Sequence, residues 1–119
     1  MNIRKMLRSF SYAFKGAFAL FKQENNARFH LLAAGVAVLL GIYFRIRLWE
    51  WAAVTVCIFG VFSAEAFNTA LEKLCDRLLP ERDPAIGLVK DLAAAAVLFA
   101  AGGSVVVGLL VFGRRLLGY

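Results

Sequence analysis

Apolar side chains recur every three or four residues in the first part of the chain. They occupy one face of a helix between residues 2 and 23, an arc of about 120° at 100° per residue: Ile3, Met6, Leu7, Phe10, Phe14, Ala17, Phe18 and Phe21. The other side carries cations: Arg4, Lys5, Arg8, Lys15 and Lys22. Because a membrane-spanning helix would not carry so many cations, the pattern predicts an amphipathic helix lying in the membrane surface. A helix packed on a protein core is the alternative.

Three long apolar segments follow, and they predict membrane spans at about residues 29–49, 49–74 and 92–113. The third, Leu92–Gly113, has no charged residue and is long enough to cross about 30 Å of hydrocarbon. Trp49 and Trp51 stand at the start of the second span, where interfacial anchors are expected. The links are residues 45–47 and the polar segment Asp76–Asp91, which contains Pro80 and Pro84. Small residues recur along two spans, which favours close helix packing: Ala33, Ala37, Gly41, then Ala93, Ala96, Ala100, Gly103.

Composition agrees with a membrane protein. Of the 119 residues, 61% are hydrophobic and 18% charged, and the mean hydropathy is +0.71, whereas soluble chains have about 45–50% apolar and about 25% charged residues. This excludes a secreted disulfide scaffold, a disordered tail and a conventional cytosolic kinase or dehydrogenase. The length predicts a single membrane-embedded domain over residues 1–119. Cys57 and Cys75 form no CxxC motif, and a structural disulfide is not expected.

The net charge of +6 indicates attraction to anionic lipid rather than to nucleic acid, because no nucleic-acid-binding motif is present. Cations gather in the N-terminal region and the second link: Arg4, Lys5, Arg8, Lys15, Lys22, Arg28, Lys73, Arg77, Arg82 and Lys90. The opposite side has fewer: Arg45, Arg47, Arg114 and Arg115. The positive-inside rule therefore predicts a cytoplasmic N-terminus and a cytoplasmic second link.

One carboxylate lies deep in an apolar segment. Glu65 is the single charged residue of Trp51–Leu71, and a carboxylate at such depth costs about 2.5–3.5 kcal/mol on insertion scales, so it is a functional candidate. Asn68, Glu72 and Asp76 follow at +3, +7 and +11, within about 80° of one helical face. Together these four residues predict a polar ladder that runs from the membrane interior to the cytoplasmic surface. The alternative is a polar seam that only holds helices together.

Spacing separates the roles of these groups. Glu65 and Glu72 are about 10.5 Å apart along a helix axis, too far for both to ligate one Mg²⁺ at about 2.1 Å. If Glu72 binds a metal, its obvious partner is Glu24, between the surface helix and the first span. Lys90 and Asp91 open the predicted third span, where a Lys and a helix start both favour phosphate. The set suggests phosphoryl transfer to a membrane substrate, without a Walker A motif or a protein-kinase motif.

At this point a resemblance becomes specific. The stretch Glu65-Ala-Phe-Asn68-Thr69-Ala70-Leu71-Glu72-Lys-Leu-Cys75-Asp76 resembles the pattern E-x-aliphatic-N-[ST]-A-aliphatic-E-x-x-V-D of the small bacterial diacylglycerol kinase and undecaprenol kinase family. Phe67 and Cys75 depart from it at packing positions, and every polar position matches. The resemblance extends to Lys15-Gly16, Glu24–His30 and Lys90–Val97, and so covers essentially the whole chain.

The resemblance implies an all-α homotrimer in the bacterial inner membrane, with an N-terminal surface helix, three spans per protomer and active sites shared between subunits. It implies ATP as donor, Mg²⁺ as cofactor and a lipid alcohol as acceptor. By matching position, Glu65 is the catalytic base and Glu24 and Glu72 are the metal ligands. The nucleotide contacts are Tyr12, Lys90 and Asp91, and the supporting residues are Asn68 and Asp76. No role is assigned to Lys5. For Tyr12, the alternative to a nucleotide contact is a role as an anchor at the membrane interface.

The acceptor stays open between two lipid alcohols. The stretch Glu24-Asn-Asn-Ala-Arg28-Phe-His30 resembles the undecaprenol kinase branch more than the diacylglycerol kinases, so undecaprenol is favoured over diacylglycerol. For His30, a packing or headgroup role is favoured over metal ligation. Two other classes remain as alternatives: a small proton-coupled multidrug transporter, which needs four spans, and a structural subunit of a membrane complex, which would not need the clustered acids.

Overall fold

The computed structural model describes residues 1–81 and 83–118. Within these ranges the chain forms four helices and no strand: α1 (Ile3–Gln23), α2 (Asn25–Phe44), α3 (Leu48–Leu78) and α4 (Pro84–Leu116). Helices α2, α3 and α4 are each long and apolar enough to cross a membrane. The predicted all-α fold with three candidate membrane spans is therefore confirmed.

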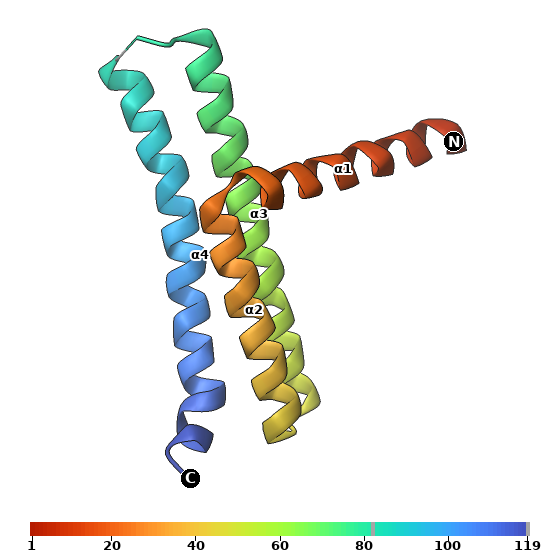
Figure 1. The fold of residues 1–119 in the computed structure, drawn as a ribbon, viewed down its shortest axis with the longest axis vertical. Coiled ribbons are helices and arrows are strands. Elements are labelled where there is room, and N and C mark those ends of the chain that lie inside the picture. Colours follow the sequence, from red (N-terminus) through yellow and green to blue (C-terminus); the bar gives the residue numbers. More distant parts are fainter. Residues whose placement is uncertain (82, 119) are drawn as a thin grey trace.

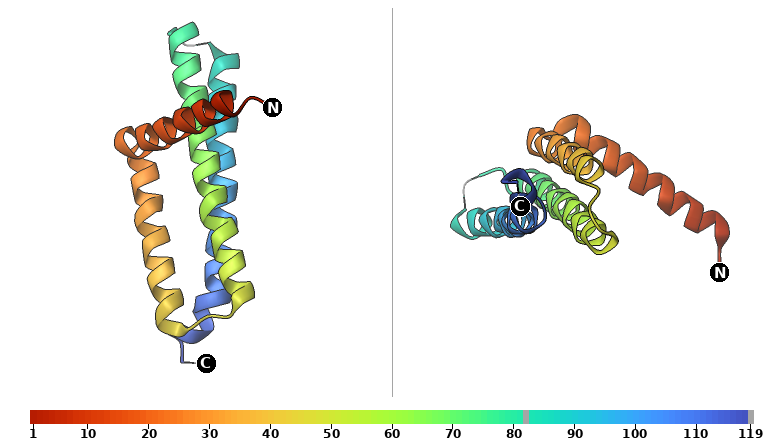
Figure 2. Two further views of the ribbon diagram at one scale, coloured as in Figure 1. Left: turned by 90° about the vertical axis from the view of Figure 1, so that its right-hand side faces the viewer. Right: turned by 90° about the horizontal axis from the view of Figure 1, so that it is seen from below.

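The three long helices lie side by side, and α1 projects sideways from them (Figure 1). Helices α3 and α4 share the most extensive contact, and α2 packs mainly on α3. The left view of Figure 2 shows that α3 and α4 continue past the level of α1 toward the segment that joins them. The radius of gyration is 17.5 Å, against about 13.5 Å for a compact chain of this length, because the long helices and the projecting α1 make the molecule extended.

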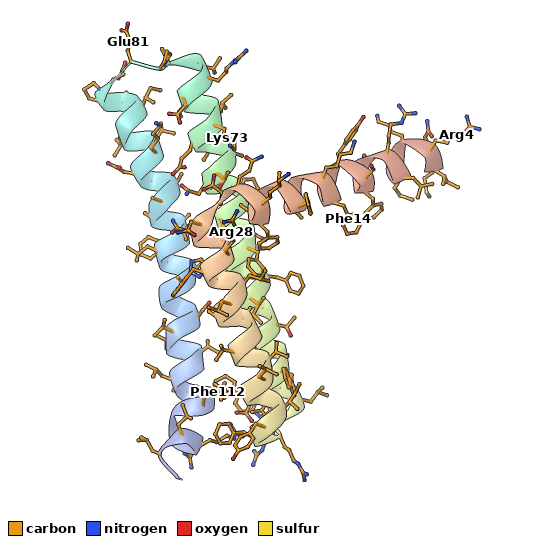
Figure 3. All side chains as sticks on the ribbon, viewed as in Figure 1. Arg4, Phe14, Arg28, Lys73, Glu81 and Phe112 are labelled. Atoms are coloured by element: carbon orange, nitrogen blue, oxygen red, sulfur yellow. The ribbon has the colours of Figure 1, made fainter. Side chains whose placement is uncertain are left out.

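A single residue separates α1 from α2. Glu24 has φ −103° and ψ 117°, an extended conformation that turns the chain between the helices. Arg28, at the start of α2 (Figure 3), donates from Nε to the carbonyl oxygen of Phe21 at 2.8 Å and from its guanidinium to that of Lys22. These carbonyls belong to the last turn of α1, where helix geometry leaves acceptors unpaired. Arg28 thereby fixes the point where α1 leaves the bundle and where Glu24 stands.

The first link occupies residues 45–47, as predicted. Arg45 adopts a left-handed conformation with φ 51°, and its N–H bonds back to the end of α2. Glu50 then accepts the Arg47 N–H at 3.0 Å and two guanidinium N–H groups of Arg115 at 2.6 and 2.8 Å. Glu50 is only 4% exposed. This bidentate pair joins the start of α3 to the end of α4, a contact that the sequence analysis did not predict.

The second link is much shorter than predicted. Helix α3 continues to Leu78 and α4 begins at Pro84, so most of Asp76–Asp91 is helical. Proline is well suited to the first position of a helix because no N–H is required there. Asp83 caps the same end by accepting the Ala85 N–H at 2.8 Å. Of the cations counted in this link, Arg82 lies outside the described residues.

Because the helices extend into the link, they exceed the predicted spans. Helix α4 has 33 residues, about 50 Å at 1.5 Å per residue, whereas the hydrocarbon core is about 30 Å thick. The predicted spans 49–74 and 92–113 therefore mark the apolar parts of longer helices. The polar ends of α3 and α4 face each other beyond the apolar region, which brings Asp76 and Lys90 together.

The opposite end of the bundle holds a small apolar core. Ile46, Val54, Val111 and Phe112 are buried there, and Trp51 packs against them. A Cβ placed on Gly41 would lie 2.6 Å from the nearest ring atom of Trp51. The predicted small-residue face of α2 is thus used to seat an indole ring. Trp49 is exposed, as an anchor should be, whereas Trp51 is half-buried and packs on Gly41.

Gly41→Ala is expected to destabilise the bundle. The added methyl would displace the Trp51 ring, and such overpacking costs about 1–3 kcal/mol. Gly35→Ala, on the same helix with open space around its Cβ position, is the matched control and should be neutral or stabilising because alanine favours the helix. Thermal unfolding of the two variants in detergent measures the difference. Equal midpoints would show that Gly41 is not needed for the contact with Trp51.

Candidate active site

The deep carboxylate predicted from the sequence is buried inside the protein. Glu65 lies in the middle of α3 and is 2% exposed. Its Oε1 atom lies 3.3 Å from Nε2 of His30 on α2. The same oxygen has no hydrogen-bond partner with good geometry, so the two groups are close but not yet aligned. A buried carboxylate oxygen without a partner calls for an explanation, and a catalytic role for the carboxyl group is one.

The predicted polar ladder is present along α3. Glu65 is buried, Asn68 and Glu72 are half-buried, and Asp76 is exposed. Asn68 donates from Nδ2 to Oε1 of Glu72 at 3.3 Å. Its own Oδ1 is buried without a partner. The side chains therefore pass from a closed apolar environment to open solvent within three helical turns, and Asn68 fixes one oxygen of Glu72.

A cation from α4 meets the exposed end of the ladder. Nζ of Lys90 forms an ion pair with Asp76, which joins α4 to α3 at the level of the ladder. The expectation that Lys90 and Asp91 open a helix is wrong, because α4 begins six residues earlier at Pro84. The helix N-terminus therefore adds nothing to phosphate binding at Lys90, and only the ammonium charge remains. Asp91 is exposed beside it.

Glu24 lies at the α1–α2 junction and is half-buried. The charges of Glu24 and Glu72 both act on Glu65, which places all three carboxyl groups in one electrostatic neighbourhood. Over residues 1–81 and 83–118 no three His, Cys, Asp or Glu side chains are grouped closely enough to form a complete metal cage. Glu24 and Glu72 are two half-buried carboxylates, and such a pair fits Mg²⁺, which typically takes one or two carboxylates and completes its shell with water and phosphate.

Tyr12 is not brought to the ladder within the protomer. It lies in the N-terminal half of α1, which points away from the bundle (Figure 1). Its side chain is exposed, and Nζ of Lys15 lies 5.8 Å from the centre of its ring. The fold thus assembles Glu24, Glu65, Asn68, Glu72, Asp76 and Lys90 at one end of the apolar region and leaves Tyr12 apart.

Sequence reasoning missed the position of His30. The signal was present, because Phe29–Phe44 and Trp51–Leu71 each contain one residue among Asp, Glu, Lys, Arg and His, and these residues are His30 and Glu65. Polar groups inside a membrane are expected to face each other rather than lipid. Applying that rule across the two spans would have paired them.

An apolar cavity of about 310 Å³ opens beside His30 between α2, α3 and α4. Its walls include Ala33, Phe62, Val107 and Phe112. A cavity of this kind accepts hydrocarbon, and it has His30, next to Glu65, as its polar end. The arrangement combines an apolar cavity, a buried carboxylate and a charged surface at the exposed end of the ladder.

Comparisons with known proteins point to one family. The family model described as prokaryotic diacylglycerol kinase matches residues 11–112, a range that contains every candidate site residue. An undecaprenol kinase of Bacillus subtilis is 33% identical over 93% of this chain and 90% of its own. A diacylglycerol kinase of Synechocystis is 35% identical over 87% of this chain and 59% of its own, and one of Sinorhizobium is 30% identical over 82% and 70%.

The protein is therefore a membrane-embedded lipid kinase. It belongs to the prokaryotic diacylglycerol kinase family, as the resemblance of the ladder indicated. The family membership sets aside both other classes considered, the transporter and the structural subunit. Three candidate spans in the described part of the chain also fall short of the four that the transporter needs.

Proposed function

We propose that this lipid kinase transfers the γ-phosphoryl group of ATP to the hydroxyl of undecaprenol, with diacylglycerol as the second candidate acceptor. The observation that carries the choice is His30, which belongs to the stretch Glu24–His30 that resembles the undecaprenol kinase branch and which lies 3.3 Å from Glu65. The Bacillus subtilis relative, which this chain matches over 90% of that protein's length, is also named an undecaprenol kinase.

The positions of the side chains support one role for each. Glu65, buried at the cavity end, takes the proton of the acceptor hydroxyl while the new O–P bond forms and the bond from the γ-phosphorus to ADP breaks. Glu24 and Glu72 hold Mg²⁺, which when bound neutralises phosphate charge. Asn68 orients Glu72 through the 3.3 Å hydrogen bond.

The nucleotide is assigned to the exposed end of the ladder. Lys90 is available to the phosphates of ATP once they compete with Asp76 for its ammonium group. Asp91, exposed beside Lys90, and Tyr12 complete the nucleotide contacts. Asp76 supports the site by holding Lys90 toward α3 when the nucleotide is absent. Because the transition state is loose, positioning and charge neutralisation carry most of the acceleration.

We infer further that the enzyme is a homotrimer whose α1 helices lie in the cytoplasmic surface of the bacterial inner membrane. Figure 3 shows Phe14 on the side of α1 that faces the apolar part of the bundle, and Arg4 on the other side. Along α4, Ala96 and Gly103 are exposed, which leaves a small-residue surface for a second protomer. A neighbouring subunit would also supply the Tyr12 that the protomer's own bundle lacks.

An acceptor assay tests the choice of substrate. Purified protein in mixed micelles, given radiolabelled ATP and equal surface concentrations of undecaprenol or diacylglycerol, is expected to show kcat/KM at least about tenfold higher for undecaprenol, a difference of about 1.4 kcal/mol in transition-state binding. The Bacillus undecaprenol kinase, assayed alongside, controls for lipid presentation. An equal or higher value with diacylglycerol would reverse the assignment, and no labelled lipid from either would contradict the proposed acceptor class.

A further inference from the structure

His30 and Glu65 are an isolated pair of ionisable groups. Each is the single Asp, Glu, Lys, Arg or His of its apolar run, Phe29–Phe44 on α2 and Trp51–Leu71 on α3. The fold nevertheless places His30 Nε2 at 3.3 Å from Glu65 Oε1. Since unpaired polar groups in an apolar interior are costly, this juxtaposition of two lone groups from separate helices points to a joint role.

The exposure of the two side chains is unequal. Glu65 is 2% exposed, whereas His30 is 19% exposed and borders the apolar cavity. His30 therefore stands between the buried carboxyl and the space that hydrocarbon can occupy. The Phe29 ring packs edge-on against the imidazole, with centroids 5.7 Å apart and planes at 76°, which restricts the rotation of the His30 ring.

We propose that His30 is a positioning residue for Glu65. Its Nε2–H donates a hydrogen bond to Oε1 of Glu65 when the acceptor lipid is bound, which leaves Oε2 to meet the hydroxyl of that lipid. In the structure Oε1 has no aligned partner and His30 Nε2 is within reach, so a small rotation completes the bond. Catalytic hydrogen bonds often tighten only when substrate is bound. The inference rests on the proposed role of Glu65 as base.

Two amide substitutions of His30, one to Gln and one to Asn, distinguish a positioning role of His30 from its other possible roles. In His30→Gln the side-chain nitrogen takes the place of Nε2 and keeps the donor, although it cannot titrate. In His30→Asn the amide stands nearer the backbone, in the place of Nδ1, and does not reach Glu65. His30→Leu removes the donor altogether, and Leu31→Ala on the same turn of α2, at an exposed side chain, controls for altered lipid packing.

Kinetics of the four variants test the proposal. His30→Asn and His30→Leu are expected to lower kcat by about 10–100-fold, the range for outer partners that orient metal ligands, with KM for both substrates nearly unchanged. His30→Gln and Leu31→Ala should stay close to the parent. If His30→Leu does not fold, the comparison of Gln with Asn decides. Equal kcat for Gln and Asn, whether both low or both normal, would overturn the positioning role.

A double-mutant cycle distinguishes the failure of this inference from that of the proposed function. In the Glu65→Gln background, His30→Asn is expected to cause no further loss, because residues that act as a unit are not additive. Additive losses would show that His30 acts apart from Glu65 and would overturn the inference alone. If Glu65→Gln itself retains the parent kcat, the proposed base is wrong, and the positioning role falls with it.

Discussion

Glu65→Gln is expected to lower turnover by at least about 10²-fold, the loss typical of a missing general base. The substitution keeps the size of the side chain and removes its capacity to accept a proton at neutral pH. Nucleotide binding should be unchanged, because the groups assigned to ATP lie at the exposed end of the ladder, around Lys90. Turnover with radiolabelled ATP and binding of a fluorescent nucleotide measure the two effects separately.

A Glu→Gln substitution outside the site provides the control for Glu65→Gln. Glu81→Gln changes an exposed carboxylate in the link between α3 and α4 and should turn over like the parent. Native mass spectrometry in mild detergent should give a trimer for the parent and for both variants, and a monomer in all three would contradict the shared site. If Glu65→Gln phosphorylates lipid near the parent rate, Glu65 only holds helices together, and Asp76 is the next candidate for the base.

The spans could be predicted because lipid imposes a simple rule on sequence. Every backbone polar group must be satisfied inside the helix, so long uncharged runs such as Leu92–Gly113 become membrane helices. The ends could not be predicted by the same rule. Helix α4 starts at Pro84 because Asp83 and Pro84 form a good N-terminus, and that local chemistry outweighs the polar composition that suggested a long link.

The candidate site was partly predictable for a related reason. Periodicity on one helix places Glu65, Asn68 and Glu72 together, because the spacing alone determines the face. Contacts between helices are not fixed by spacing, and both pairs that the sequence left unassigned, His30 with Glu65 and Glu50 with Arg115, cross from one helix to another. Trimer formation, membrane orientation and the surface position of α1 stay predictions.

Glu72→Gln and Glu24→Gln are each expected to raise the Mg²⁺ concentration needed for half-maximal activity by at least about tenfold, because each removes a carboxylate charge from the metal. The structure makes Glu72→Gln a clean test. Asn68 donates to Oε1 of Glu72, and the amide oxygen of Gln can accept that bond, so the packing is kept while the charge is lost. Activity measured over a range of free Mg²⁺ should be partly restored at the highest concentrations.

Binding of Mn²⁺ followed by electron paramagnetic resonance, in the presence of ADP, supplies a readout that does not depend on turnover. Both variants should bind Mn²⁺ more weakly than the parent, whereas Glu81→Gln and Glu65→Gln should bind it equally well, since Glu65 is about 10.5 Å along the axis from Glu72. Parent-like Mn²⁺ binding in Glu24→Gln would leave Glu72 as the single carboxylate ligand. Weakened binding in Glu65→Gln would instead place the metal deeper, beside the base, and the division of roles along the ladder would then be wrong.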